Sequence, residues 1–170
     1  METYNWNSFT KRINVNAPAE SIYEMWATSA GIEKWFLRQC LITTENSTSR
    51  SATDLFDVGD RYIWRWHGWP DDVVEKGRIL KANGKDELQF TFGQVDAEDM
   101  VCTVKIYPED GESICELKQE NIPEDEKGKS YYHVGCLTGW TFYLSNLKSI
   151  LEGGIDLRNK NERLTNLINS

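Results

Sequence analysis

Positive charge is scarce in this sequence. Its 170 residues include 19 Lys and Arg against 27 Asp and Glu, which gives a formal net charge of −8 at pH 7. Proteins that bind nucleic acids or anionic membranes present basic surfaces. No run of Lys or Arg stands out from this acidic background. The charge balance therefore argues against a nucleic-acid partner.

Long apolar stretches are also missing. A helix that spans a bilayer needs about 20 consecutive apolar residues, and no segment of this chain approaches that length. Residues 1–9 lack a basic segment followed by an apolar one, which is the pattern of a secretory signal. We therefore expect a cytoplasmic protein without a membrane span.

Histidine and cysteine, the usual ligands of transition metals, are few. The chain has two His and four Cys, and the four are Cys40, Cys102, Cys115 and Cys136. No two of these cysteines form a C-x-x-C pair. Isolated cysteines within apolar patterns are typical of reduced thiols in a protein core. We therefore expect neither a metal site nor another cofactor.

No catalytic motif is recognisable either. No serine or cysteine lies in a nucleophile context. The acidic residues gather in segments with the composition of turns, such as Asp71–Asp72 and Glu124–Glu126. Such clusters are more typical of solvated loops than of acid–base pairs. Enzymatic activity is uncertain and less expected than binding, and no catalytic residue is assigned.

The most distinctive feature present is a long amphipathic stretch, residues 130–154. Its apolar positions are three and four residues apart, which places them on one face of a helix: Val134, Leu137, Trp140, Leu144, Leu147 and Leu151. Gly153 and Gly154 are suited to end that helix. We expect a rod of roughly 30 Å.

Segments with alternating apolar and polar residues precede this helix. They predict about seven strands, over residues 8–16, 39–45, 61–67, 73–81, 88–92, 100–107 and 113–119. Two short helices interrupt them after the first strand. One is expected to start at an Asn16 N-cap and to end near Trp26, and the other covers residues 30–35 after a Thr28 cap.

Consecutive strands joined by short turns make an antiparallel sheet, and one face of such a sheet must be covered. The terminal helix is the only element long enough to cover it. The sequence therefore predicts an α+β fold in which a curved antiparallel sheet wraps around a long C-terminal helix. We expect one domain over residues 1–170, with a core at 9–154 and a polar tail at 155–170. Residues 46–53 are polar and are expected to form an exposed connector.

Several short strings follow one another along the chain: residues 15–23, 26–28 with 32–36, 56–62, 87–92, 117–119, and Gly139-Trp140 followed by 144–154. In this order they resemble the activator-of-Hsp90-ATPase-homologue-like (AHSA1-like) family of the START/Bet v 1-like (SRPBCC) superfamily. Asp60 stands where the family usually has a second glycine. The resemblance covers residues 9–154 and implies a helix-grip (Bet v 1/START-like) fold with a cavity between sheet and helix. Superfamily members bind lipids, hormones or polyketides, and some family members resemble a co-chaperone domain.

The aromatic residues of the predicted strands gather on one face. The face that converges on the interior comprises these residues of the strands and the terminal helix: Tyr62, Trp64, Trp66, Phe90, Phe92, Cys102, Cys115, Leu117 and Trp140, with Cys136 beside them. Such a set suits a flat or elongated apolar ligand. The alternative is that these rings fill the interior themselves. The pattern alone leaves both possibilities open.

Two polar residues share this inward face. Gln119 points inward by strand alternation, and His133 lies seven residues before Trp140 on the helix. Buried polar groups need partners, and a histidine titrates near neutral pH. Each is more typical of a satisfied structural residue, but the pair is also the best candidate for holding the polar end of a ligand.

Three functions are compatible with these patterns. The first is a carrier or sensor that binds a small hydrophobic molecule between the sheet and the helix, and the aromatic face favours it. The second, implied by the resemblance alone, is a chaperone-associated or stress-response module that acts through its surface. The third is an enzyme that uses His133 and Gln119. Either a monomer or a homodimer is compatible with the sequence.

Overall fold

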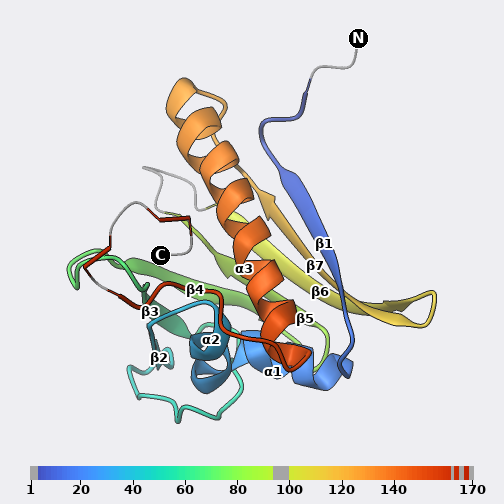
Figure 1. Ribbon diagram of the computed structural model, residues 1–170. Coiled ribbons are helices and arrows are strands. Elements are labelled where there is room, and N and C mark those ends of the chain that lie inside the picture. The colour runs from blue at the N-terminus through green and yellow to red at the C-terminus, as the bar shows by residue number, and fades with distance from the viewer. Residues whose placement is uncertain (1–3, 94–99, 162, 165–166, 169–170) are drawn as a thin grey trace.

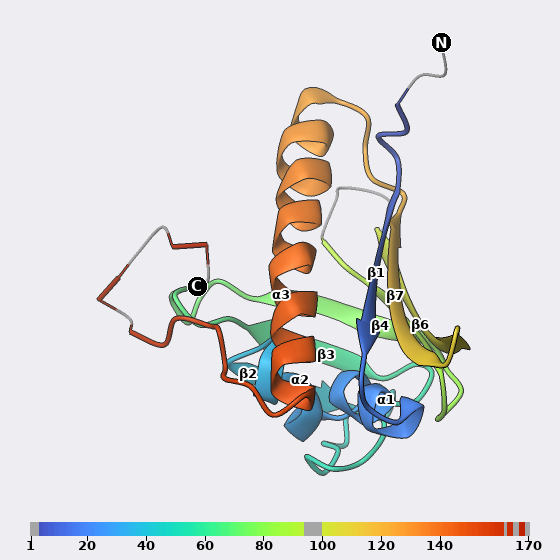
Figure 2. The same ribbon diagram turned by 45° about the vertical axis from the view of Figure 1, so that its right-hand side comes forward.

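The fold is that of a computed structural model, which describes residues 4–93, 100–161, 163–164 and 167–168. In this part of the chain, seven antiparallel strands form one sheet in the order β1-β7-β6-β5-β4-β3-β2. The sheet curves around α3 (Figures 1 and 2). The strands are β1 (Phe9–Val15), β2 (Gln39–Thr43), β3 (Arg61–Arg65), β4 (Glu75–Ala82), β5 (Glu87–Thr91), β6 (Val101–Glu109) and β7 (Glu112–Glu120). This is the α+β helix-grip fold that the sequence predicts.

The strands form where alternation gives each one a buried face. In β3, for example, Tyr62 and Trp64 are buried, whereas Arg61 is exposed. Tight turns then set the register. The β6–β7 turn consists of Asp110 and Gly111, both with positive φ, as the favoured two-residue hairpin turn requires. Strand β3 ends two residues before the predicted boundary at residue 67.

Two short helices, α1 (Ala19–Ala27) and α2 (Ser29–Trp35), follow β1 and lie near one end of α3 (Figure 1). The predicted Thr28 cap is confirmed, since its hydroxyl accepts from the Gly31 N–H at 2.9 Å. The predicted Asn16 cap is wrong. Helix α1 begins after Pro18, which occupies the N-cap position. A residue that precedes proline is disfavoured in helical conformation, so Ala17 cannot form the first turn that an Asn16 cap would need.

The long helix has two parts, where the sequence predicts a single α-helix over residues 130–154. It starts as a π-helical segment, η1 (Gly128–Gly135), and continues as α3 (Cys136–Leu151). A π-helix has more residues in each turn than an α-helix, so side-chain directions drift relative to the α-helical pattern. This explains why Val134, predicted to point inward, is exposed, whereas Trp140, Leu144 and Leu147 are buried as expected. Gly153 has a positive φ just beyond the helix end.

The start of the tail packs against the body of the protein. Residues 155–161 pass α2, and the Arg158 side chain donates to the backbone oxygens of Glu33, Lys34 and Leu37 at 2.7–3.0 Å. Arg158 thereby satisfies carbonyl groups at the C-terminal end of α2, which lack partners within the helix. The same guanidinium pairs with Asp156 at 2.7 Å. In the described part of the chain, no helix is long and apolar enough to cross a membrane.

Candidate functional site

A cavity of about 520 Å³ lies between the sheet and the start of the long helix, and we call it the helix pocket. Its walls come from the end of α2, from residues 66–75 after β3, from the end of β5, and from η1 and the first turns of α3. Eight aromatic residues line it: Phe36, Trp66, Trp69, Phe92, Tyr131, Tyr132, Trp140 and Tyr143. The volume is within the range of about 300–1,000 Å³ that small-molecule sites occupy.

Trp140 is a wall of the helix pocket that several contacts hold in place. Its ring stacks on Phe36 with centroids 4.9 Å apart and lies 5.2 Å from the ring of Phe92. Its indole N–H donates to the Oε1 atom of Gln119 at 3.0 Å. Buried tryptophans usually require such a partner. The ring is therefore fixed in orientation by contacts within the protein.

Glycine residues of the helix leave room beside this ring. Gly139 lines the pocket, and a Cβ atom placed on it would meet nothing within 4 Å. The nearest contact of a Cβ placed on Gly135, which also lines the pocket, would be the Ser130 oxygen at 4.0 Å. Glycine inside a helix is unfavourable by about 1 kcal/mol relative to alanine. Both positions thus lower helix propensity and leave space in the pocket.

The pocket environment is apolar enough to suppress ionisation of its titratable groups. Burial raises the pKa of the Tyr143 hydroxyl to about 12. Burial also dominates at Cys136, where it raises the pKa of the thiol to about 11. There a hydrogen bond from Gln119 acts in the opposite direction, and the negative charge of Glu75 adds to the rise. Both groups are therefore uncharged at neutral pH.

Four of the inward-facing residues predicted from the sequence line the helix pocket: Trp66, Phe92, Cys136 and Trp140. Six others lie in a continuous packed core below it, and all are at most 1% exposed: Tyr62, Trp64, Phe90, Cys102, Cys115 and Leu117. There Tyr62 stacks on Trp64 with ring centroids 3.9 Å apart. Both alternatives from the sequence therefore hold in part, because rings fill one end of the interior and line a cavity at the other.

Gln119 and His133 do not meet in the structure. Gln119 is fully buried behind Trp140, whose N–H its side-chain oxygen accepts. The Nδ1 atom of His133 lies 2.8 Å from the Trp6 backbone oxygen, and its Nε2 atom lies 2.9 Å from the Tyr4 hydroxyl. Its ring also packs edge-on against Phe9 of β1. His133 therefore fastens the N-terminal segment to η1, and it does not line the helix pocket.

Sequence reasoning missed most of the remaining lining. Trp69 lies in the connection between β3 and β4, where alternation carries no information. Val73 lies at the start of the strand predicted over residues 73–81, but β4 begins only at Glu75. Tyr131 and Tyr132 belong to η1, where α-helical spacing does not apply. Glu75 had a usable signal, since it alternates with Gly77 and the buried Ile79 in β4 and so belongs to the inner face. The acidic side chain on that face was overlooked.

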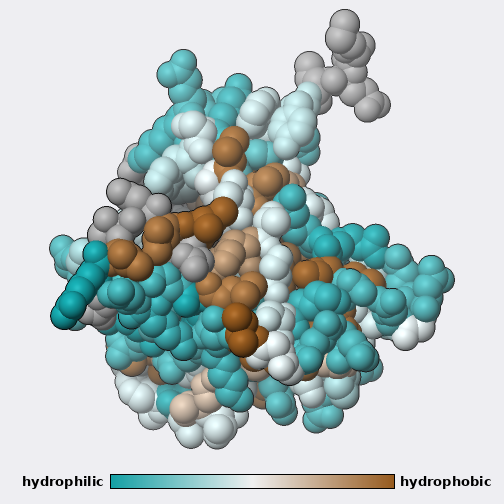
Figure 3. Space-filling model, viewed as in Figure 1, coloured by the Kyte–Doolittle hydropathy of each residue, from teal (hydrophilic) through white to brown (hydrophobic). Residues whose placement is uncertain are grey.

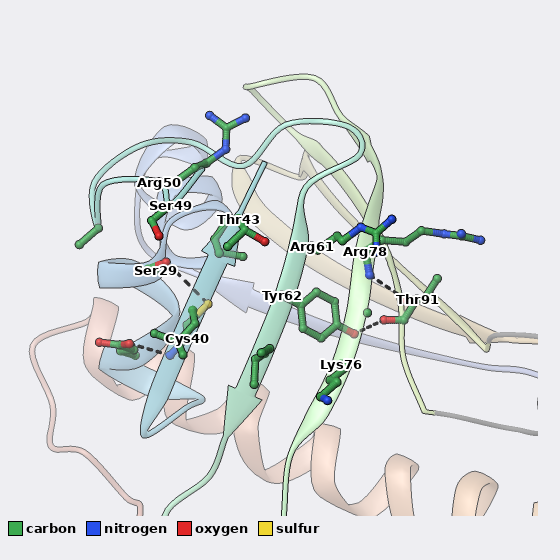
Figure 4. A pocket seen from close by; sticks show the side chains of 16 residues that line it. Ser29, Cys40, Thr43, Ser49, Arg50, Arg61, Tyr62, Lys76, Arg78 and Thr91 are labelled. Carbon is green, nitrogen blue, oxygen red and sulfur yellow. Dashed lines mark hydrogen bonds between the residues drawn. The ribbon is translucent and has the colours of Figure 1, made fainter. Parts of the chain in front are cut away.

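A second hollow, of about 730 Å³, lies over β2, β3 and β4, and we call it the outer groove. Figure 4 shows its lining, in which the Tyr62 side chain points from β3 toward Thr91, to whose backbone oxygen its hydroxyl donates. Charged side chains such as Arg61, Lys76 and Arg78 are exposed around it. Arg50, in the loop after β2, is ion-paired with the buried Asp60. This open, charged hollow is a less suitable site for an apolar ligand.

Figure 3 shows apolar residues over the lower part of α3 and beside it, within a largely hydrophilic surface. Exposed Ile155, Leu164, Leu167 and Ile168 belong to the tail. The spacing of Leu164, Leu167 and Ile168 in the sequence is compatible with one turn of an amphipathic helix. Residues 165 and 166 lie outside the described part of the chain, and no helix is assigned to the described ones. Within the described residues, no three His, Cys, Asp or Glu side chains are placed to hold a metal ion.

A curved antiparallel sheet, a long closing helix and a cavity between them define a helix-grip domain. The chain belongs to the family described as activator of Hsp90 ATPase homolog 1-like protein, whose family model matches residues 16–152. The family resemblance noted in the sequence is thus confirmed. No match was found among curated proteins.

Solved structures share this fold at low sequence identity. The Aha1 dimer from Colwellia psychrerythraea is 18% identical, with 86% of this chain and 97% of that one covered and a TM-score of 0.67. Protein MLL2253 from Mesorhizobium loti is 15% identical, with coverages of 86% and 97% and a TM-score of 0.66. CalU16 from Micromonospora echinospora is 17% identical, with coverages of 88% and 76% and a TM-score of 0.63.

Proposed function

We propose that this protein binds a small aromatic or otherwise hydrophobic molecule in the helix pocket, as a carrier or sensor. The observation that supports this most directly is a cavity of about 520 Å³ lined by eight aromatic residues. Membership of the family is consistent with such a role. Aromatic rings contribute both apolar area and specific ring-to-ring geometry to a bound ligand.

The pocket is suited to binding because part of its wall is already ordered. Trp140 is held by Gln119 and Phe36, so a ligand that stacks on it does not have to immobilise it. Ordering a flexible side chain at an interface costs about 0.5–1.5 kcal/mol. A preformed aromatic wall therefore favours affinity for flat ligands.

The decisive experiment fills the pocket without disturbing the fold. A Gly139→Leu side chain would extend into open space and would replace a poor helix former with a good one. We expect this variant to fold at least as stably as the wild type and to lose binding of the neutral fluorescent probe N-phenylnaphthylamine. The matched control is Thr138→Leu, which adds the same side chain at the adjacent exposed position of α3.

The probe's fluorescence enhancement on titration with each protein is the measurement. Wild type and Thr138→Leu should bind alike, whereas Gly139→Leu should bind at least about tenfold more weakly, a loss of about 1.4 kcal/mol. Equal binding by all three proteins would show that the probe sits elsewhere. No binding by the wild type would contradict the proposal.

A second candidate is a chaperone-associated module that acts through its surface, and the description of the matched family favours it. It predicts that the purified protein stimulates the ATPase activity of Hsp90 and that Gly139→Leu stimulates it equally. An unchanged ATPase rate at saturating protein would argue against this role. Size measurement in solution would distinguish a monomer from a homodimer, the form in which the Colwellia protein was solved.

A further inference from the structure

One acidic side chain, Glu75, lies among the rings of the helix pocket. It belongs to β4 and pairs across the sheet with Trp64 of β3, on the face that carries the buried Ile79. Its Oε1 atom accepts the Gly93 N–H at 2.7 Å, which fixes the carboxylate near the end of β5. Its charge also acts on Cys136, across the pocket on the helix. Glu75 therefore places negative charge inside the pocket.

The rest of the described lining supplies no positively charged side chain. Of the 17 described residues that line the pocket, Glu75 is the only carboxylate and none is a Lys, Arg or His. Two described cations contact lining residues from outside. The Arg38 Nε donates to the Trp66 backbone oxygen at 3.2 Å and its guanidinium pairs with Asp71, and the Lys127 ammonium lies 5.8 Å from the centre of the Tyr132 ring. Lys127 is exposed, and Glu124, Asp125 and Glu126 precede it in the chain. Solvent and these acids weaken its effect on the pocket.

The aromatic lining, like Glu75, favours a positively charged ligand. The faces of tryptophan and tyrosine rings are electron-rich and attract cations within about 6 Å of the ring centre. Trp66, Trp69, Tyr132 and Tyr143 all border the pocket that contains Glu75. A carboxylate together with such rings forms a site that is complementary to an ammonium group and unfavourable to an anion.

We propose that the ligand of the helix pocket is a cationic amphiphile, an aromatic or branched apolar body that carries an ammonium group beside Glu75. This inference rests on the proposed function and names the chemical class of its ligand. The apolar body stacks on Trp140 and Phe92, and the positive group lies between Glu75 and the rings of residues 66–69. Neutral ligands of the same shape bind the same walls without this electrostatic contribution.

The test compares two probes of the same shape. One is (naphthylmethyl)trimethylammonium, and the other is its neutral analogue, in which a carbon replaces the quaternary nitrogen. Their affinities are measured by displacement of N-phenylnaphthylamine from the wild type and from Glu75→Gln. The glutamine side chain keeps an oxygen that can accept the Gly93 N–H, and it removes the negative charge. Glu24→Gln is the control, because it removes the same charge from an exposed position on α1.

We expect Glu75→Gln to lower the affinity for the cationic probe by about tenfold and the affinity for the neutral probe by less than about twofold. Glu24→Gln should leave both affinities unchanged. If Glu75→Gln changes the affinities of the two probes equally, or changes neither affinity, the proposed role of the Glu75 charge is wrong. The proposal that the pocket binds a hydrophobic ligand would not be affected by that result. Failure of both probes to displace N-phenylnaphthylamine that the wild type binds would also overturn the proposed role of this charge. Failure of N-phenylnaphthylamine itself to bind would instead refute the proposed function.

Discussion

Replacing Arg158 tests whether the start of the tail is part of the folded structure. The side chain is 3% exposed and pairs with Asp156 at 2.7 Å. Its guanidinium also donates to three backbone oxygens at the end of α2, those of Glu33, Lys34 and Leu37. Arg158→Met keeps a long unbranched side chain but removes every donor. The variant leaves those carbonyl groups and a carboxylate without the partner they have in the wild type.

The expected cost follows from these contacts. Asp156 is 22% exposed and keeps Lys160 at 2.8 Å, so most of the cost comes from the α2 carbonyl groups that lose a donor. A hydrogen bond to a charged group contributes about 1.5–3 kcal/mol. The contributions of these hydrogen bonds overlap, so we expect a total loss of about 3–5 kcal/mol. For a domain of this size, 1 kcal/mol corresponds to about 2–4 °C, so Tm should fall by about 6–20 °C. Phe36, which stacks on Trp140, follows α2 directly, so the pocket should loosen as well.

The pH dependence of this loss has a defined sign. Burial alone would raise the pKa of the Asp156 carboxyl, but hydrogen bonds from Arg158 and Lys160 outweigh it and lower that pKa well below its usual range. A carboxyl with a lowered pKa stabilises the fold above its unfolded-state pKa of about 3.9. That stabilisation is lost as the pH falls toward the folded-state pKa. The stability difference between wild type and Arg158→Met should therefore shrink as the pH drops below about 4.

Urea denaturation followed by circular dichroism measures this difference, at pH 7 and at acidic pH. Arg163→Met is the matched control, since Arg163 is exposed on the same tail. It should lower the free energy of unfolding by less than about 0.5 kcal/mol. A loss below about 1 kcal/mol for Arg158→Met would refute the reasoning. A loss that stays constant down to pH 3 would show that the ion pair with Asp156 does not contribute to it.

Three further predictions follow from the core. Gly77→Ala should lower the free energy of unfolding, measured by urea denaturation, by about 1–3 kcal/mol, because its Cβ atom would overlap the Tyr62 hydroxyl oxygen. An unchanged free energy of unfolding would contradict this packing. Gln119→Leu should cost about 1–3 kcal/mol by the same measurement, because the Trp140 N–H loses its acceptor; an equally stable variant would contradict that role. Iodoacetamide should label Cys136 slowly at pH 8, because a thiol with a pKa of about 11 stays protonated. Bound N-phenylnaphthylamine should slow this labelling further. Rapid labelling of Cys136 in the native protein would contradict the burial of its thiol.

The fold was predictable because the sequence repeats simple patterns. Alternation in β3 and the three-four spacing of Trp140, Leu144 and Leu147 each specify one buried face. Ordered family motifs then specified how the elements assemble. Val134 was wrongly predicted to point inward, because a π-helical turn changes the direction of side chains without an obvious signal in the sequence.

The site was less predictable because a cavity is a property of several elements at once. The sequence indicated that rings face inward, and the structure shows that Trp64 and Phe90 meet other rings, whereas Trp66 and Trp140 border free space. Trp69 lies in the connection between β3 and β4, where no periodicity indicates its direction. His133 shares the buried side of the helix with Trp140 but faces the N-terminal segment. Helical spacing indicates the side on which a residue lies but not its neighbours there.

The division of the long helix into two halves has a consequence for how such proteins diverge. Leu144 and Leu147 anchor the helix to the core. The positions that shape the pocket, such as Tyr131 and Gly139, precede them in chain order. Mutations at these positions can change the shape of the pocket while the anchoring part keeps the fold intact. A lineage built on this helix can therefore acquire pockets of new shape through a few substitutions in its first turns, without passing through unfolded intermediates.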